Sequence, residues 1–319
     1  MISNPFSRMD RRAPELKDLQ SWINSEPLKL IDLKGKIILL DFWTYSCINC
    51  LRTLPHLKEM YKRYSSKGLV IIGIHTPEFD FEHDLENVKK AVKKHSLLYS
   101  IALDNNHTTW DLYGNRYWPR STLIDAKGNV RMEHVGEGGY DEIEDKIIEL
   151  LTEIGFSMKD KVLQPYGAKY EVGTTPETYC GSLRNEGIGN IASDNFYEDK
   201  RDHVKDIIFL QGHWQQYPQS LHHFTDKEGY ILLKYSASEV NVVLKPYFEG
   251  EFKVEIMLDG KPLSKEDAGK DIKFEKNRSF VVVDHADMYN IVNSKKFGTH
   301  ELKLVTNSKD FSIYAYTFG

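Results

Sequence analysis

A Cys-x-x-Cys pair between a predicted strand and a predicted helix constrains the fold of this chain more than any other feature. Cys47 and Cys50 follow a buried strand predicted for 37–42, and helical periodicity begins directly after them. A thiol in the first turn of a helix faces unpaired backbone N–H groups and the positive end of the helix dipole, which both stabilise a thiolate. Because the thiolate is the nucleophile, this order predicts a redox site in which Cys47 attacks and Cys50 resolves the mixed disulfide.

Buried strands and amphipathic helices alternate through the first 155 residues, as is typical of an α/β domain. The strands at 37–42 and 69–75 are joined through a helix, so they should be parallel with a right-handed crossover. A lead-in helix and an edge hairpin are predicted within 14–33. The remaining predicted elements are helices at 51–64, 87–95, 108–113 and 141–151, a short strand at 101–103 and a hairpin at 118–135.

The chain changes character after residue 155. Between 156 and 178 periodicity fades and Gly, Pro, Lys and Thr recur, which indicates a linker between a redox domain at 1–155 and a second domain at 179–319. The second domain shows short apolar runs, turn signals and no convincing helix, which predicts an antiparallel β-sandwich or jelly roll. Its eight runs are 207–210, 230–235, 240–244, 252–258, 280–283, 289–292, 301–305 and 311–318.

The composition is that of a globular protein with two domains. At 319 residues the chain is long for one domain, and 40% hydrophobic with 28% charged residues gives ample material for two cores. Lys and Arg total 42 against 47 Asp and Glu, and the net charge of -5 argues against nucleic acid as a partner. Three cysteines are too few for a disulfide-stapled scaffold.

The sequence leaves the compartment open. No apolar run approaches the ~20 residues that span a bilayer, and residues 1–12 carry charges without an apolar signal region. A cytoplasmic protein is expected if this chain is the whole gene product. The alternative is the extracytoplasmic, membrane-associated face of a larger assembly.

The residues around the cysteine pair resemble two nested families. Asp-Phe-Trp-x-x-x-Cys-x-x-Cys, with Asp41 six positions before Cys47, is similar to the active-site stretch of thioredoxin-fold proteins. The string WTYSCINCLRTLP at 43–55, together with IHTPEF at 74–79, resembles more narrowly the thioredoxin-like part of DipZ-type proteins. In that family a β-sandwich similar to a carbohydrate-binding module follows, and a polytopic membrane part is commonly joined to both. The resemblance covers nearly the whole chain.

The resemblance implies a thioredoxin-like protein-disulfide oxidoreductase. Its Cys47–Cys50 dithiol would exchange with protein or small-thiol partners, and a membrane electron-transfer partner is implied too. Asp41 lies on a strand predicted to be buried, where the pKa of a lone carboxylate tends to rise; the resemblance implies that it accepts the proton of Cys50. An acid bonded to a local donor is the alternative. Pro119 matches a proline that is cis and faces the cysteine pair in thioredoxin-like folds.

Five further side chains are expected to shape the surface that a partner protein meets. Residues between the two cysteines set the redox poise in this fold class. Ordinary packing of aromatic groups is the alternative for Trp43 and Tyr45. The five expected groove residues are Trp43, Tyr45, Ile48, Asn49 and Trp118.

Two other chemistries compete with disulfide exchange. Residues 44–47 read Thr-x-x-Cys, which resembles peroxiredoxins, where the threonine and an arginine activate the peroxide. Thr44 and Arg120 are the candidates for those roles, with Cys47 as the thiol. Zinc is disfavoured because it takes about four ligands and the sequence has no second Cys-x-x-Cys. We predict no metal and no cofactor.

The second domain raises the question of a binding function. It is rich in Tyr, Phe and His, with local clusters at 212–214 and 222–224. Aromatic faces stack on sugar rings, and the module resemblance implies a glycan; a docking or dimerisation surface is the alternative. In that case the thioredoxin-like part could serve only as a scaffold for glycan or partner binding. Cys180 is expected to be a small buried hydrophobe.

Overall fold

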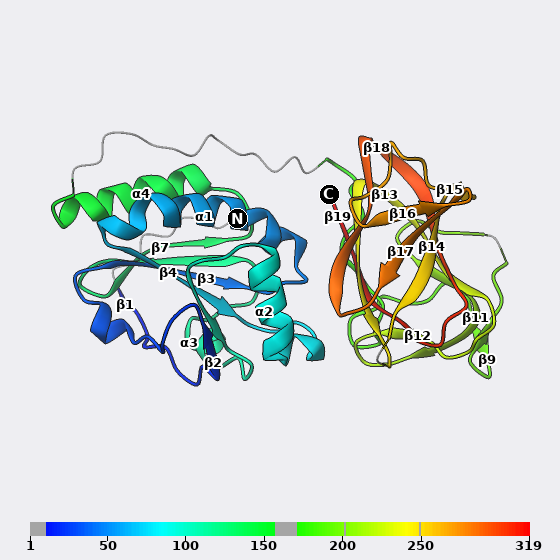
Figure 1. The fold of residues 1–319 in the computed structure, drawn as a ribbon, viewed down its shortest axis with the longest axis horizontal. Coiled ribbons are helices and arrows are strands. Elements are labelled where there is room, and N and C mark those ends of the chain that lie inside the picture. Colours follow the sequence, from blue (N-terminus) through cyan, green and yellow to red (C-terminus); the bar gives the residue numbers. More distant parts are fainter. Residues whose placement is uncertain (1–10, 157–170, 201, 249) are drawn as a thin grey trace. The chain divides into compact units, whose positions relative to one another are not determined.

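The computed structural model describes residues 11–156, 171–200, 202–248 and 250–319. It divides the chain into two compact units, Met1–Ala168 and Lys169–Gly319 (Figure 1). Most of the linker predicted at 156–178 and of the charged start at 1–12 falls outside the described residues. None of the described helices combines the length and the hydrophobicity that crossing a bilayer requires.

The first unit is built on a seven-stranded sheet with the order β1-β7-β6-β3-β4-β5-β2. β3, β4 and β5 are parallel, and β6 and β7 form the predicted antiparallel hairpin. The α/β, thioredoxin-like fold expected for this half is confirmed. The strands are β1 (Arg11–Arg12), β2 (Ser21–Ile23), β3 (Ile37–Trp43), β4 (Leu69–His75), β5 (Ser100–Leu103), β6 (Arg120–Ile124) and β7 (Asn129–Val135).

Helices flank this sheet on both sides. α1 and α4 lie side by side along one face (Figure 1), where the Tyr64 hydroxyl donates to Glu144 Oε1 at 2.5 Å. α1 begins three residues earlier than predicted because Cys47 itself caps the helix, and Pro55 lies inside it. The described α-helices are α1 (Ile48–Tyr64), α2 (Leu85–Lys94), α3 (Thr108–Leu112) and α4 (Tyr140–Glu153).

Strand β3 divides its side chains between the two faces of the sheet, and all of its residues are buried. Leu40 and Phe42 contribute to a core near α3, where the Phe42 ring lies 5.4 Å from the Tyr113 ring. Because side chains alternate along a strand, Asp41 and Trp43 point to the opposite face. Both faces are therefore covered, which explains why the strand is apolar throughout except at Asp41.

The lead-in helix predicted within 14–33 is wrong. This segment is mostly irregular and contributes only β2, which pairs with β5, and the 3-10 helix η1 (Leu30–Leu33). Leu16, Leu19 and Trp22, whose spacing suggested a helix, instead pack against the core of the sheet. Tertiary contacts have overridden the local periodicity here.

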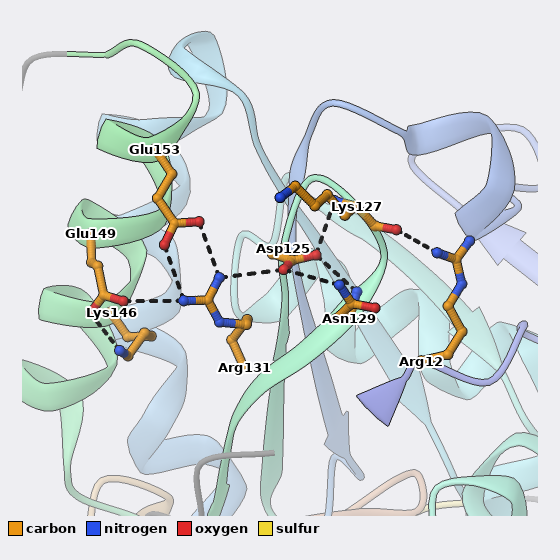
Figure 2. A network of polar contacts seen from close by, with 8 residues as sticks. All are labelled: Arg12, Asp125, Lys127, Asn129, Arg131, Lys146, Glu149 and Glu153. Atoms are coloured by element: carbon orange, nitrogen blue, oxygen red, sulfur yellow. Dashed lines mark hydrogen bonds and ion pairs between the residues drawn. The ribbon is translucent and has the colours of Figure 1, made fainter. Parts of the chain in front are cut away.

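The turn between β6 and β7 is tied to α4 by a short polar network (Figure 2). Asp125 Oδ1 accepts the backbone N–H of Asn129 at 2.8 Å. Arg131 is 13% exposed, and its guanidinium lies 3.3 Å from Asp125 Oδ2. The same guanidinium contacts Glu149 at 3.4 Å and Glu153 at 3.0 Å, both on α4. Arg131 thus fixes the hairpin against α4.

The second unit is all-β, as predicted, and its strands form a twelve-stranded sheet. Its core gathers apolar side chains from most of these strands, including the fully buried Trp214, Ile256 and Phe311. The strands are β8 (Thr178–Tyr179), β9 (Ala192–Ser193), β10 (Phe196–Tyr197), β11 (Ile208–Gln216), β12 (Leu221–His223), β13 (Gly229–Pro246), β14 (Phe252–Leu258), β15 (Lys261–Pro262), β16 (Ile272–Glu275), β17 (Arg278–Val283), β18 (Asp287–Thr306) and β19 (Phe311–Phe318).

Two pairs of predicted strands are in fact single long strands. The runs 230–235 and 240–244 both lie in β13, and 289–292 and 301–305 both lie in β18. The first part of β13 pairs with β11 and its last part pairs with β19. A register shift against β18 between Ala237 and Glu239 marks the change of partner. Such an irregularity bends a strand, so that one strand serves two parts of the sheet.

Candidate functional site

The two cysteines meet at the start of α1. Cys47 is the N-cap residue, and the backbone N–H of Cys50 donates to Cys47 Sγ at 3.3 Å. Cys47 is partly exposed, whereas Cys50 is 0% exposed. Burial, and then the adjacent Cys47, raise the pKa of Cys50 well above its ordinary value. Cys47 is therefore the thiol that a partner can reach, and Cys50 keeps its proton at neutral pH until a base removes it.

Asp41 is a titratable group in the core of the first unit. It is 0% exposed and lies beside Gly73 of β4 and Ser121 of β6. Neither carboxylate oxygen has a partner of normal hydrogen-bond geometry among the described residues. Burial raises the pKa of Asp41 to about 7, and the Ser121 hydroxyl opposes part of that rise. The charge of Asp41 also raises the pKa of Cys50, which places the two groups within electrostatic reach.

The Trp118–Pro119 peptide bond is cis, as the resemblance implied. The carbonyl of Pro119 accepts the backbone N–H of Gly136 at 2.8 Å. Trp118 is half-buried, and its Nε1–H donates to the carbonyl of Thr76 at 3.1 Å. The segment before β6 is therefore held both by the loop that follows β4 and by the loop that follows β7.

The expected groove residues fall into two groups. Ile48, Asn49 and Trp118 are half-buried, so part of each side chain reaches the surface. Trp43 is 0% exposed and Tyr45 is 2% exposed, and their rings lie 5.4 and 5.7 Å from the ring of His75. The expectation that Trp43 and Tyr45 line the groove is therefore corrected, because the core beneath the site encloses both rings.

The two candidate peroxidase residues are engaged elsewhere. The Thr44 hydroxyl is fully buried and donates to Glu82 Oε1 at 2.5 Å. The Arg120 guanidinium lies 2.8 Å from Glu133 Oε1 on β7 and also donates to the carbonyl of Gly114 at 3.0 Å. Neither group is free to orient a peroxide at Cys47 in this arrangement.

Glu82 is a residue at the site that the sequence analysis missed. It lies in the 3-10 helix η3 (Asp80–His83), is 0% exposed, and accepts hydrogen bonds from Thr44 and Ser46 just before the first cysteine. The available signal was an acid within the aromatic stretch Phe79-Asp80-Phe81-Glu82, only a few residues beyond the string that carried the resemblance. Burying a carboxylate is costly, so the complete burial of Glu82 needs a reason.

The second unit contains a partly exposed group of aromatic rings. Tyr217, Tyr247 and Phe248 are 37, 43 and 56% exposed. The His222 ring stacks on Tyr247 with centroids 3.7 Å apart and an angle of 5°. We call these four residues the aromatic cluster. Cys180 lies apart from it as a core residue with 0% exposure, in agreement with the sequence prediction.

A metal centre receives no support from the geometry. Within the described parts of the chain, no three His, Cys, Asp or Glu side chains gather in a way that would hold a metal ion. His75, which lies near the redox turn, is fully buried, and burial lowers its pKa to about 3. It is a neutral core side chain whose Nε2 atom lies 3.4 Å from the Thr44 hydroxyl.

Comparison with known proteins finds similar sequences for both units. Residues 9–133 match the AhpC/TSA family, and residues 175–319 match the thioredoxin like C-terminal domain family. The thiol-disulfide oxidoreductase ResA of Bacillus thuringiensis is 32% identical over 122 residues, which cover 38% of this chain and 68% of that protein. A crystal structure of a thiol:disulfide interchange protein of the thioredoxin family from Chlorobium tepidum superposes with a TM-score of 0.39 at 25% identity, covering 46% of this chain and 98% of the other.

Through its first unit, the chain belongs to the thioredoxin-like thiol-disulfide oxidoreductases. More particularly, it is a homologue of protein DipZ of Mycobacterium bovis and Mycobacterium tuberculosis, with 32% identity over 96% of its length. The similarity extends through both units, so the DipZ-type resemblance is confirmed. The chain spans 43% of the length of these DipZ proteins.

Proposed function

We propose that Cys47 and Cys50 are the catalytic couple of a protein thiol-disulfide exchange enzyme. The Cys47 thiolate attacks one sulfur of a partner disulfide, forms a mixed disulfide and releases the other partner sulfur as a thiolate. Cys50 then gives its proton to Asp41 and attacks Cys47 Sγ. The Cys47–Cys50 disulfide forms, and the partner leaves with both of its sulfurs reduced. The reverse sequence oxidises a partner dithiol.

The observation that best supports this proposal is a partly exposed Cys47 whose sulfur accepts the backbone N–H of Cys50. Cys50 and Asp41 are both fully buried and lie within electrostatic reach of each other. A carboxyl group with a pKa of about 7 exchanges a proton readily near neutral pH, which is what the resolving step requires. Pro119, Trp118, Ile48 and Asn49 form the proposed partner groove around Cys47. Trp43 and Tyr45 support it from the core.

A trapping experiment tests the proposal. In Cys50→Ser the mixed disulfide on Cys47 has no resolving thiol, so it should accumulate on incubation with a disulfide-containing protein such as insulin. Non-reducing electrophoresis would show a band that dithiothreitol removes. The same experiment with Cys47→Ser should give no such band. Trapping by Cys47→Ser as strong as by Cys50→Ser would contradict the assigned roles.

We further propose that a membrane electron-transfer protein renews the couple on the extracytoplasmic face. The support is the similarity to DipZ through both units, since DipZ-type proteins commonly join a polytopic membrane part to this portion. The purified Cys50→Ser variant, incubated with a membrane fraction of the source cell, should capture that protein as a mixed disulfide. Recovery of only aqueous-phase partners would count against a membrane donor.

A glycan is a second candidate ligand, because the aromatic cluster offers exposed rings to a sugar. Tyr217 and Tyr247 are both partly exposed, and their ring centroids lie 6.0 Å apart at an angle of 30°. Aromatic side chains present a large apolar ring surface. A pyranose ring of the glycan would stack on the exposed part of such a ring. Titration with neutral oligosaccharides should perturb the protein fluorescence, and Tyr247→Ala should abolish that change. An unchanged response in Tyr247→Ala would remove the aromatic cluster from consideration.

A further inference from the structure

Glu82 connects two loops that flank the redox couple. Its Oε1 atom accepts the Thr44 hydroxyl at 2.5 Å, and the hydroxyl and backbone N–H of Ser46 at 2.7 and 3.3 Å. Its Oε2 atom accepts the backbone N–H groups of Glu78 and Phe79 at 2.6 and 3.0 Å. We call Glu82 and these four residues the Glu82 clasp. Five donors therefore converge on one fully buried carboxylate.

The donors of the Glu82 clasp favour the ionised form of the carboxylate. Both oxygens act as acceptors, and an ionised carboxylate, which only accepts, matches all five donors. Burial opposes ionisation and raises the pKa of Glu82, and the charge of Glu78 adds to that rise. The hydroxyl groups of Thr44 and Ser46 act in the other direction. A buried charge with this many donors is a costly device, so its position at the redox turn calls for an explanation.

The clasp holds together the segments that must be aligned for disulfide exchange. Thr44 and Ser46 belong to the turn that leads directly into Cys47. Glu78 and Phe79 belong to the loop after β4, and Thr76 in that loop accepts the indole N–H of Trp118 at 3.1 Å. Trp118 precedes Pro119. A continuous path of hydrogen bonds and a few chain residues thus runs from the redox turn through Glu82 to the cis-proline segment.

We propose that Glu82 is a positioning residue for thiol-disulfide exchange, which fixes Cys47 Sγ relative to the Pro119 segment where a partner disulfide docks. This inference rests on the proposed roles of Cys47 and Cys50. Attack on a disulfide requires the three sulfur atoms to be in line, so a small displacement of the redox turn slows the attack on a docked protein. The same displacement matters much less to a small reagent that approaches from any side.

The experiment compares these two kinds of reagent in reduced protein at neutral pH. Glu82→Gln has nearly the same shape, but its amide NH2 turns one acceptor position into a donor that faces other donors. We expect attack on the disulfides of insulin to slow roughly tenfold to a hundredfold, the range for a misplacement near 1 Å. Alkylation of Cys47 by iodoacetamide should change far less. Ser46→Ala should give a smaller loss, and its effect should be non-additive with Glu82→Gln because both act through the same hydrogen bonds.

Glu144→Gln is the matched control, because Glu144 is also a 0% exposed glutamate that accepts a hydroxyl, from Tyr64. The Glu144→Gln variant shows how much the loss of any buried carboxylate in this unit affects the reaction. Its rate of attack on insulin should equal that of the wild type. Equal losses of insulin reduction and of alkylation in Glu82→Gln would overturn the inference, as would a loss that Glu144→Gln reproduces. If Glu82→Gln does not fold, the Ser46→Ala variant alone tests the inference, by the ratio of its rate of insulin reduction to its rate of alkylation by iodoacetamide. If the wild type itself shows no reversible dithiol, the proposed function fails and not merely the role of Glu82.

Discussion

The backbone N–H of Cys50 points at Cys47 Sγ from a distance of 3.3 Å, so the resolving residue helps to hold the attacking one. The contact arises because Cys47 stands at the N-cap of α1, where the first backbone N–H groups have no partners within the helix. The sulfur of Cys47 takes the place of the oxygen that commonly caps a helix. The backbone N–H of Cys50 is therefore already in position to stabilise a negative charge on Cys47 Sγ.

The two thiols should differ strongly in their reaction with iodoacetamide. In the reduced protein at neutral pH we expect Cys47 to be modified first, because Cys50 and Cys180 are both 0% exposed and burial raises the pKa of each well above its ordinary value. Peptide mapping by mass spectrometry at increasing times gives the three rates. Faster modification of Cys50 than of Cys47 would reverse the assigned roles.

Asp41→Asn should slow the resolving step more than the first attack. The Asp41 carboxyl accepts the proton of Cys50 in the proposed mechanism, and an amide cannot do so. A general base contributes roughly 10²–10⁴-fold in such steps. Rapid-mixing measurements with a disulfide peptide separate formation of the mixed disulfide from its resolution. An Asp41→Asn variant with both rates unchanged would exclude Asp41 from the reaction.

The same substitution should make the reduced protein more stable than the wild type at pH 7. The pKa of Asp41 is about 7 in the fold against 3.8 as the ordinary value, so between these pH values the folded state binds the extra proton. Wild-type stability therefore falls as the pH rises from 4 to 7, by up to ~4 kcal/mol from this group. Urea unfolding should show Asp41→Asn gaining on the wild type across that window, with little difference at pH 3.5. A difference that does not depend on pH would mean that Asp41 titrates normally.

Peroxide should be a poor substrate. Thr44 is bonded to Glu82 and Arg120 is paired with Glu133, so neither is available to activate a peroxide at Cys47. We expect slow consumption of hydrogen peroxide in the presence of a thiol donor, and no specific loss in Arg120→Lys. Rapid turnover that Thr44→Val abolishes would instead favour the peroxidase alternative, in which Cys47 forms a sulfenic acid.

Arg131→Met should destabilise the first unit by about 1–3 kcal/mol, because it leaves Asp125 and two carboxylates of α4 without their shared cation. Lys146→Met is the matched control, since Lys146 pairs only with Glu149 on its own helix in the contacts described here. Its cost should stay within about 0.5 kcal/mol. Urea unfolding of the reduced proteins measures both. Equal costs for the two variants would show that Arg131 does not join the hairpin to α4.

The sequence alone determined the features that depend on neighbouring residues. The apolar runs predicted β3 and β4, because a strand covered on both faces is apolar throughout. The Cys-x-x-Cys spacing between a strand and a helix predicted the redox couple, because helix geometry brings residues three apart onto one turn. The second unit was predictable as all-β from the turn signals between short apolar runs. The long strands β13 and β18 were not predictable as single strands, because the residues at a bend interrupt the apolar pattern as a turn would.

Only the tertiary structure decided which side chains act together across long separations. Glu82 lies 38 residues from Thr44 in the chain, and no local pattern links the two; the parallel pairing of β3 with β4 brings their loops to the same edge of the sheet. The rings of Trp43 and Tyr45, which were expected in the groove, are buried against His75 of β4. The burial and the hydrogen bonds of a side chain depend on the elements that cover it. The packing of segments far apart in the chain determines which elements these are.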